Sequence, residues 1–137
     1  MAKPVTDEQF RTLARFRAAL RRFLRFSEEA ARSAGLSPQQ HQALLALRAR
    51  PEEPMTIGEI ALELAVRPHS AVGMIDRLAA QDLVERWRSA GDRRQVKVRL
   101  TARGIEVLTS LGAAHRAELR RVGPELGALL AALGREE

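Results

Sequence analysis

The sequence contains no cysteine, and this absence excludes several kinds of chemistry at once. Without a thiol the chain can form no disulfide, thiolate metal site or cysteine nucleophile, and it cannot sense oxidants through sulfur. The sequence also lacks a run of about 18 apolar residues of the kind that spans a membrane. Its start, MAKPVTDEQF, lacks the basic and apolar regions of a secretory signal. These absences predict a soluble, cytoplasmic protein with no membrane partner.

Side chains arranged for catalysis or metal binding are also scarce. There is no glycine-rich phosphate loop, Ser70 has no evident general base, and the carboxylates are scattered through predicted helix starts. The three histidines, His41, His69 and His115, are far apart and lack the i, i+4 spacing of a helical metal pair. The sequence therefore predicts no enzyme activity, no metal and no cofactor.

Positive charge is abundant and is concentrated in one segment. The net charge is +6, and between Arg86 and Arg103 there are seven basic residues and one acidic residue, Asp92. This segment therefore carries a charge equal to that of the whole chain, and the other residues sum to zero. A surface that binds a polyanion is one interpretation, and a solvated arginine-rich surface is the alternative.

Capping patterns and apolar periodicity predict two helices in the first third of the chain. Thr6-Asp7-Glu8-Gln9 is a capping-box pattern, and apolar residues recur every three or four positions to predict a helix over 7–34. Ser37-Pro38 begins a second helix that ends near Arg50, before two prolines. The apolar stripe of the first helix is broad, so part of it faces either a second subunit or the rest of this chain.

Two short helices joined by a tight turn follow. Thr56 begins the first of them, and Pro68 begins the second, because proline suits the first helical position. The second helix is expected to bury Val72, Ile75, Leu78 and Ala79. Its other face, with the turn before it, gives a candidate groove-binding set: Arg67, His69, Ser70, Gly73, Met74 and Arg77. Core packing of Met74 and a solvent-facing position for His69 are the alternatives.

The pattern then changes to that of a β-hairpin followed by helices. Residues 83–87 and 95–100 are predicted strands, and the loop between them has the glycine and aspartate that hairpin turns use. Thr101 begins a further helix, Gly123-Pro124 is predicted to break it, and a last amphipathic segment runs to residue 133.

This order of elements predicts a mainly α fold with a small β wing. A winged helix-turn-helix lobe over 37–101 is flanked by helices over 7–34 and 102–133, all within one domain spanning 1–137. In such a lobe the second short helix lies in the DNA major groove while the first braces it across the backbone. The wing set comprises Arg86, Arg88, Asp92, Arg93, Arg94 and Lys97.

The segment from Ile57 to Thr101 resembles the DNA-binding lobe of MarR family transcriptional regulators. The motifs MIDRL and LVER and a wing of the form D-x-R followed by a strand ending in L-T occur in the family's order. The resemblance implies that Arg94 enters the minor groove and that Asp92 pairs with basic neighbours to position it. Arg77, Arg86, Arg88 and Lys97 would contact phosphates, which supply affinity without sequence information.

The resemblance further implies a homodimer that binds a near-palindromic operator, with repression as the commoner outcome and a small anionic or aromatic effector that releases the DNA. The expected dimer contacts are Phe10, Leu13, Leu119, Leu126, Leu129 and Leu130, and the hypothetical effector residues are Arg17, Arg21 and His41. Solvated arginines without an effector, activation, a protein-binding winged helix and a sequence-neutral DNA binder remain open.

Overall fold

The computed structural model describes residues 2–135, and over these residues the chain forms five α-helices and one three-stranded antiparallel sheet. The helices are α1 (Asp7–Ser33), α2 (Pro38–Arg48), α3 (Ile57–Leu64), α4 (Pro68–Ala80) and α5 (Ala102–Leu133). The strands are β1 (Met55–Thr56), β2 (Val84–Arg88) and β3 (Val96–Leu100). The predicted fold class, mainly α with a small β wing, is confirmed. The chain forms two compact units, residues 31–112 and the two terminal segments.

The helix starts in the first unit are set by reciprocal capping. The hydroxyl of Ser37 accepts a hydrogen bond from the backbone N–H of Gln40 at 3.1 Å, and the Gln40 side chain accepts one from the Ser37 N–H at 2.9 Å. Thr56 and Glu59 make the same pair of bonds at the start of α3, both at 3.1 Å. Each box satisfies two backbone donors that a helix start leaves without partners, which is why the predicted starts are correct.

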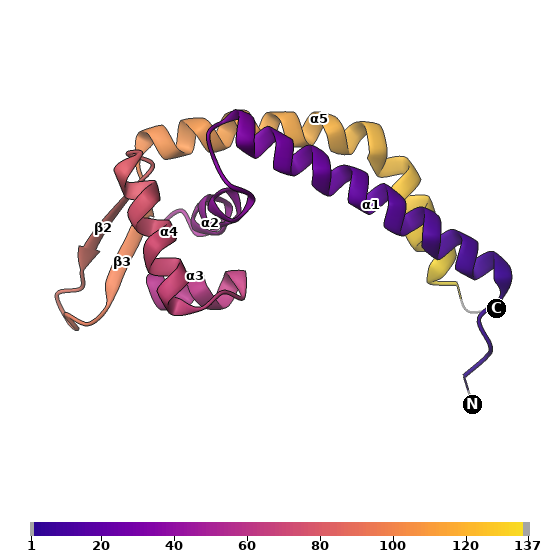
Figure 1. Cartoon of the computed structure of the whole chain (residues 1–137), viewed down its shortest axis with the longest axis horizontal. Coiled ribbons are helices and arrows are strands. Elements are labelled where there is room, and N and C mark those ends of the chain that lie inside the picture. The colour runs from indigo at the N-terminus through magenta and orange to yellow at the C-terminus, as the bar shows by residue number, and fades with distance from the viewer. Residues whose placement is uncertain (1, 136–137) are drawn as a thin grey trace. The chain divides into compact units, whose positions relative to one another are not determined.

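The core of this unit joins all three short helices to the sheet. The largest fully buried side chains come from α2, α3, α4 and β3, and they are Leu44, Ile60, Ile75, Leu78 and Val98. Figure 1 shows α2, α3 and α4 beside the β2–β3 hairpin, whose far end extends away from the helices. The helices therefore hold the root of the hairpin and leave its tip exposed.

The sheet contains one strand that the sequence did not indicate. The strand order is β1-β3-β2, with Met55 opposite Val98 on one side of β3 and Arg86 opposite Val98 on the other. β1 has only two residues, so it shows no alternating pattern. It ties the start of α3 to the central strand of the wing.

A close contact joins the start of α5 to the start of the hairpin. The Thr101 hydroxyl donates to the carbonyl of Asp82 at 2.6 Å and accepts from the Gly104 N–H at 3.0 Å. A Cβ at Gly104 would lie 2.1 Å from the carbonyl oxygen of Leu83. Glycine is therefore required here for the backbones of α5 and the hairpin to meet.

The second unit is a pair of helices, formed by most of α1 and the later part of α5, which lie side by side in Figure 1. Nε2 of His115 lies 2.7 Å from the hydroxyl of Ser27, and the rings of Phe23 and Phe26 meet the His115 ring edge-on. No helix within residues 2–135 is long and apolar enough to cross a membrane.

The predicted break at Gly123-Pro124 is wrong, because α5 is continuous from Ala102 to Leu133 with Pro124 inside it. Proline removes one backbone donor and disfavours the helix interior. Here α5 contacts α1 on both sides of the proline, through His115 before it and through Glu125, 3.8 Å from Arg22, after it. The helix therefore continues past a residue at which local propensity would end it.

Candidate nucleic-acid interface

The orientation of α4 follows from its two ends. Arg67, immediately before Pro68, has extended backbone angles (φ −68°, ψ 144°), as the residue before a proline prefers. At the other end Asp82 adopts a positive φ of 60°, which turns the chain into β2. The helix is thereby held between the turn after α3 and the root of the wing, with one side packed in the core.

The buried side of α4 differs from the predicted one by a rotation about the helix axis. Met74 is 3% exposed and lies in the core with Ala71, whereas Val72 is 42% exposed. The predictions that Met74 belongs to the groove face and that Val72 is buried are therefore wrong. Both stripes have helical spacing, and the unbranched Met side chain fills the core where the stiffer valine was expected.

The exposed side of α4 retains the other predicted groove residues. Arg67, His69, Ser70 and Arg77 are exposed, and Gly73 is half-buried. A Cβ at Gly73 would lie 3.4 Å from Nη1 of Arg77, so the guanidinium lies over the glycine one turn earlier. The resulting surface is polar at the helix start and cationic one to two turns later.

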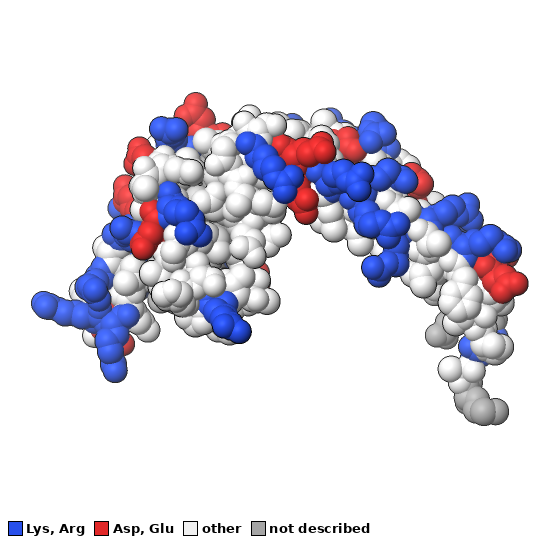
Figure 2. All heavy atoms as spheres, viewed as in Figure 1, with Lys and Arg blue, Asp and Glu red and all other residues white. Residues whose placement is uncertain are grey.

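The wing loop is ordered by its aspartate. Oδ1 of Asp92 accepts a hydrogen bond from the backbone N–H of Arg94 at 3.0 Å and lies 3.4 Å from Nε of the same arginine. Nη1 of Arg88 donates to the carbonyl of Arg93 at 2.8 Å, and Ser89 and Gln95 close the loop through the backbone. The loop is thus fixed while the Arg94 side chain stays 94% exposed. Figure 2 shows basic side chains gathered at this tip.

Two of the arginines on the wing strands have partners within the protein. Arg86 on β2 forms an ion pair with Asp76 on α4, which links the wing to that helix. Arg99 pairs with Glu85 at 2.9 Å and lies over the ring of Trp87, 5.0 Å from its centroid. The sequence analysis missed Asp76, because only the fold brings it to Arg86, ten residues away.

The residues predicted for dimer contacts lie on the helical pair. Phe10, Leu13, Leu119 and Leu130 are between 41% and 58% exposed, and Leu126 and Leu129 are half-buried. Large apolar side chains at this exposure on two long helices leave apolar area for another surface to cover.

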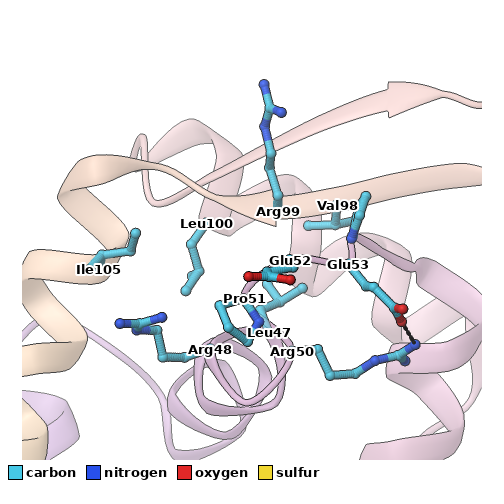
Figure 3. Close-up of a pocket in the computed structure, with 11 residues that line it drawn as sticks. Leu47, Arg48, Arg50, Pro51, Glu52, Glu53, Val98, Arg99, Leu100 and Ile105 are labelled. Atoms are coloured by element: carbon cyan, nitrogen blue, oxygen red, sulfur yellow. Dashed lines mark hydrogen bonds and ion pairs between the residues drawn. The ribbon is translucent and has the colours of Figure 1, made fainter.

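The hypothetical effector residues are not brought together within either unit. Arg17 and Arg21 are exposed on α1 in the helical pair, and His41 is buried on α2 in the other unit. A pocket of about 180 Å³ does lie in the lobe, between the end of α2, the loop before β1, and β3 (Figure 3). Pockets for drug-sized ligands usually exceed 300 Å³, so this one is smaller than a drug-sized ligand needs.

Charges around that pocket are largely compensated. Arg50 donates hydrogen bonds to Glu59 at 2.9 Å and to Glu53 at 3.1 Å. These bonds raise the pKa of Arg50, and the bond from Arg50, followed by that from the Thr56 backbone, lowers the pKa of Glu59. The pair braces the loop before β1 against the start of α3.

Among the described residues, no group of three or more histidine, aspartate or glutamate side chains is placed to hold a metal ion. The wing and the exposed side of α4 present a cationic surface beside a polar helix face.

Comparison with known proteins agrees with this geometry. The sequence model of the MarR family matches residues 34–95. AbsC from Streptomyces coelicolor, described as a MarR family transcriptional regulator, is similar in structure with a TM-score of 0.74 and 22% identity over 97% of this chain and 94% of its own. YusO from Bacillus subtilis has a TM-score of 0.72 and 24% identity over 93% of this chain and 92% of its own.

A mutant of MepR from Staphylococcus aureus, solved bound to an oligodeoxyribonucleotide, has a TM-score of 0.71 and 18% identity over 86% of this chain and 94% of its own. No curated protein matches the sequence. The resemblance to MarR family regulators inferred from the sequence is thus confirmed over residues 34–95, and the winged-helix fold is confirmed over most of the chain.

Proposed function

From the match of residues 34–95 to the MarR family, we propose that this protein is a sequence-specific DNA-binding transcriptional regulator and not an enzyme. It acts in the cytoplasm as a homodimer on a near-palindromic operator and represses transcription. The main structural support for the proposal is the ion pair between Arg86 and Asp76, which joins the ordered basic wing to the exposed face of α4. That ion pair couples the two elements that a winged helix places in adjacent grooves.

The roles of individual residues follow from this arrangement. His69, Ser70 and Arg77 read the major groove, and Val72 replaces Met74 as an apolar contact, for example with a thymine methyl group. Arg94 enters the minor groove, whose negative potential attracts arginine, and Asp92 holds the loop that presents it. Arg88, Arg93 and Lys97 contact phosphates.

Dimerisation uses the exposed apolar side chains of the helical pair. Two copies related by a twofold axis place their recognition helices on half-sites about one duplex turn apart, which explains the near-palindrome. A small anionic or aromatic effector shifts the dimer away from the DNA-binding arrangement.

The test is binding to genomic DNA fragments, beginning with the region upstream of the protein's own gene, measured across a salt series. Wild type is compared with Arg94→Ala and with Arg116→Ala, a matched loss of one exposed charge on α5. We expect tight binding to a near-palindrome that Arg94→Ala weakens by about ten-fold or more and Arg116→Ala leaves within two-fold, since a well-placed arginine contact contributes about 1–3 kcal/mol.

Two results contradict the proposal in different ways. Equal and steeply salt-dependent binding to every fragment indicates a sequence-neutral architectural protein. No DNA binding at low salt indicates a winged helix used for protein association. Sedimentation of wild type and Leu13→Asp separately tests the dimer, because a charge on the exposed apolar face should yield monomers.

A further inference from the structure

Helix α1 presents three chemically different faces. At 100° per residue, Thr12, Ala19 and Phe23 fall within about 40° of one another, and they are buried or half-buried. A second face carries apolar side chains that remain 38–49% exposed, at Leu13, Leu20 and Leu24. Two faces of the helix are therefore suited to packing, one against α5 and one against a second copy.

The third face is a stripe of arginines. Arg11, Arg15, Arg22 and Arg25 fall within an arc of about 80°, centred roughly 100° from the buried face and roughly 160° from the exposed apolar face. With a rise of 1.5 Å per residue the four Cα atoms span about 21 Å. We call these four residues the α1 arginine stripe.

The charge of this segment equals that of the wing. Residues 11–25 contain six arginines and no acidic residue, so they carry +6, as does the segment from Arg86 to Arg103. The rest of the chain has ten basic and sixteen acidic residues. The net charge of zero outside the wing segment therefore includes a second concentration of positive charge, which the acidic residues of the rest of the chain offset.

The stripe is almost uncompensated. All four side chains belong to exposed residues, and among the described residues the stripe's one ion pair joins Arg22 to Glu125 at 3.8 Å, with the two side chains 65% and 56% exposed. An exposed pair at this distance contributes little. Figure 2 shows Lys and Arg side chains along this helix. Four neighbouring guanidinium groups repel one another unless an anionic partner lies against them.

The composition of the stripe indicates the kind of anion. All four charges are arginine, whose planar group binds phosphate through paired hydrogen bonds more specifically than lysine does. A membrane surface would need apolar side chains beside the charges to enter the lipid, but the exposed leucines of α1 lie on the opposite side of the helix. A straight row of charges over about 21 Å fits the regular phosphates of a nucleic-acid backbone.

We propose that the α1 arginine stripe is a second DNA-binding surface, which holds the phosphate backbone of double-stranded DNA without reading its sequence. It goes beyond the wing and α4, and it does not depend on which operator the lobe selects. Each strand of duplex DNA carries one negative charge per roughly 3.4 Å, so a 21 Å length of the facing strand offers about six phosphates to four arginines. The stripe adds affinity and salt dependence to every DNA complex of the protein.

The experiment compares three sets of four charge-removing substitutions in the full chain. The stripe set changes Arg11, Arg15, Arg22 and Arg25 to Gln, and the wing set changes Arg88, Arg93, Arg94 and Lys97 to Gln. The matched control set changes Arg48, Arg116, Arg120 and Arg135, which are exposed elsewhere, to Gln. Circular dichroism and sedimentation show whether each variant keeps its helix content and assembly state. If the Gln variant of the stripe fails to fold, a variant with Lys at all four positions, which keeps the charge, is used in its place.

The probe is a 24-base-pair duplex of random sequence in 50–300 mM KCl. We expect the wing variant to retain binding to this duplex. Its log affinity should fall with log salt concentration with a slope of up to about 3.6 per protomer. This slope corresponds to a loss of affinity of about 150-fold over a fourfold rise in salt concentration. Adding the stripe set should abolish that residual binding, and adding the control set should leave it within two-fold.

Other outcomes overturn the proposal. Loss of all random-duplex binding in the wing variant, or identical binding after the stripe set is added, shows that the stripe does not contact DNA. Stripe-dependent binding to vesicles with 30% anionic lipid, without stripe-dependent DNA binding, assigns it to a membrane surface. Because random duplex is the probe, failure here leaves operator selection by the lobe untouched, and failure of operator selection leaves this result standing.

Discussion

Replacing Gly104 by alanine tests the contact that joins α5 to the root of the wing. The added Cβ would lie 2.1 Å from the carbonyl oxygen of Leu83 and 3.1 Å from its carbon. The oxygen belongs to the backbone and also accepts the Thr101 N–H at 3.1 Å, so no flexible side chain can move aside. Either α5 or the start of β2 must shift.

The free energy of unfolding should fall by about 1–3 kcal/mol. Overpacking of this kind costs about 1–3 kcal/mol, and weakening the Thr101 hydrogen bond costs roughly 1 kcal/mol more. The higher helix propensity of alanine returns up to about 1 kcal/mol. Gly112 lies in the same helix, is exposed, and has nothing within 4 Å of its Cβ position. Alanine there should therefore stabilise the protein by up to about 1 kcal/mol.

The measurement is urea unfolding of wild type and both variants at one fixed protein concentration, because assembly changes apparent stability. The two substitutions should move the midpoint in opposite directions. If Gly104→Ala unfolds at the wild-type midpoint or above it, the close backbone contact between α5 and the hairpin is wrong. A shift in midpoint without a change in slope shows that stability has changed while the surface exposed on unfolding has not.

Four further substitutions test local features of the lobe by urea unfolding. Ser37→Ala removes the cap of α2 and should cost about 1 kcal/mol, and an unchanged midpoint would contradict the capping box. Because the pKa of Glu59 is lowered in the folded state, its carboxylate stabilises the fold above the ordinary value of 4.5, and this contribution is lost as the pH falls through the lower folded pKa. Glu59→Gln should therefore flatten the decline of stability below about pH 5, by only tenths of a kcal/mol because the side chain is 43% exposed. Met74→Gln should cost at least about 2 kcal/mol and Val72→Gln less than about 0.5 kcal/mol, and the reverse order would restore the orientation of α4 expected from the sequence.

The helix starts of the lobe could be predicted because their cause is local. A serine or threonine followed three residues later by glutamine or glutamate supplies both partners of a capping box within four residues. Ser37 with Gln40 and Thr56 with Glu59 form these bonds in the structure. The hairpin could be predicted for a similar reason, since alternation over six residues and a Gly-Asp loop are both short-range signals.

Features that depend on distant contacts could not be predicted. Pro124 ends a helix by local propensity, yet α5 is continuous through it, with contacts to α1 at His115 before the proline and at Glu125 after it. The two residues of β1 become a strand only because β3 lies beside them. In α4 the stripe through Val72 and the stripe through Met74 have equally regular spacing. The rotation of the helix about its own axis, which decides the buried stripe, therefore depends on the shape of the core against which it packs.

The distribution of charge shows the same limit at the level of the whole chain. The formal charges of the residues outside the wing sum to zero, and a solvated surface of mixed charges would give the same sum. Helical geometry separates that sum into a row of arginines over residues 11–25 on one face of α1, bounded by Asp7 and Glu29 at the two ends of the same face, with the other acidic residues elsewhere. Electrostatic attraction in salt falls off within about 10 Å, so a polyanion responds to the local row and not to the total. Where charges lie on a folded surface, and not how many there are, therefore decides how many surfaces of this protein can hold DNA.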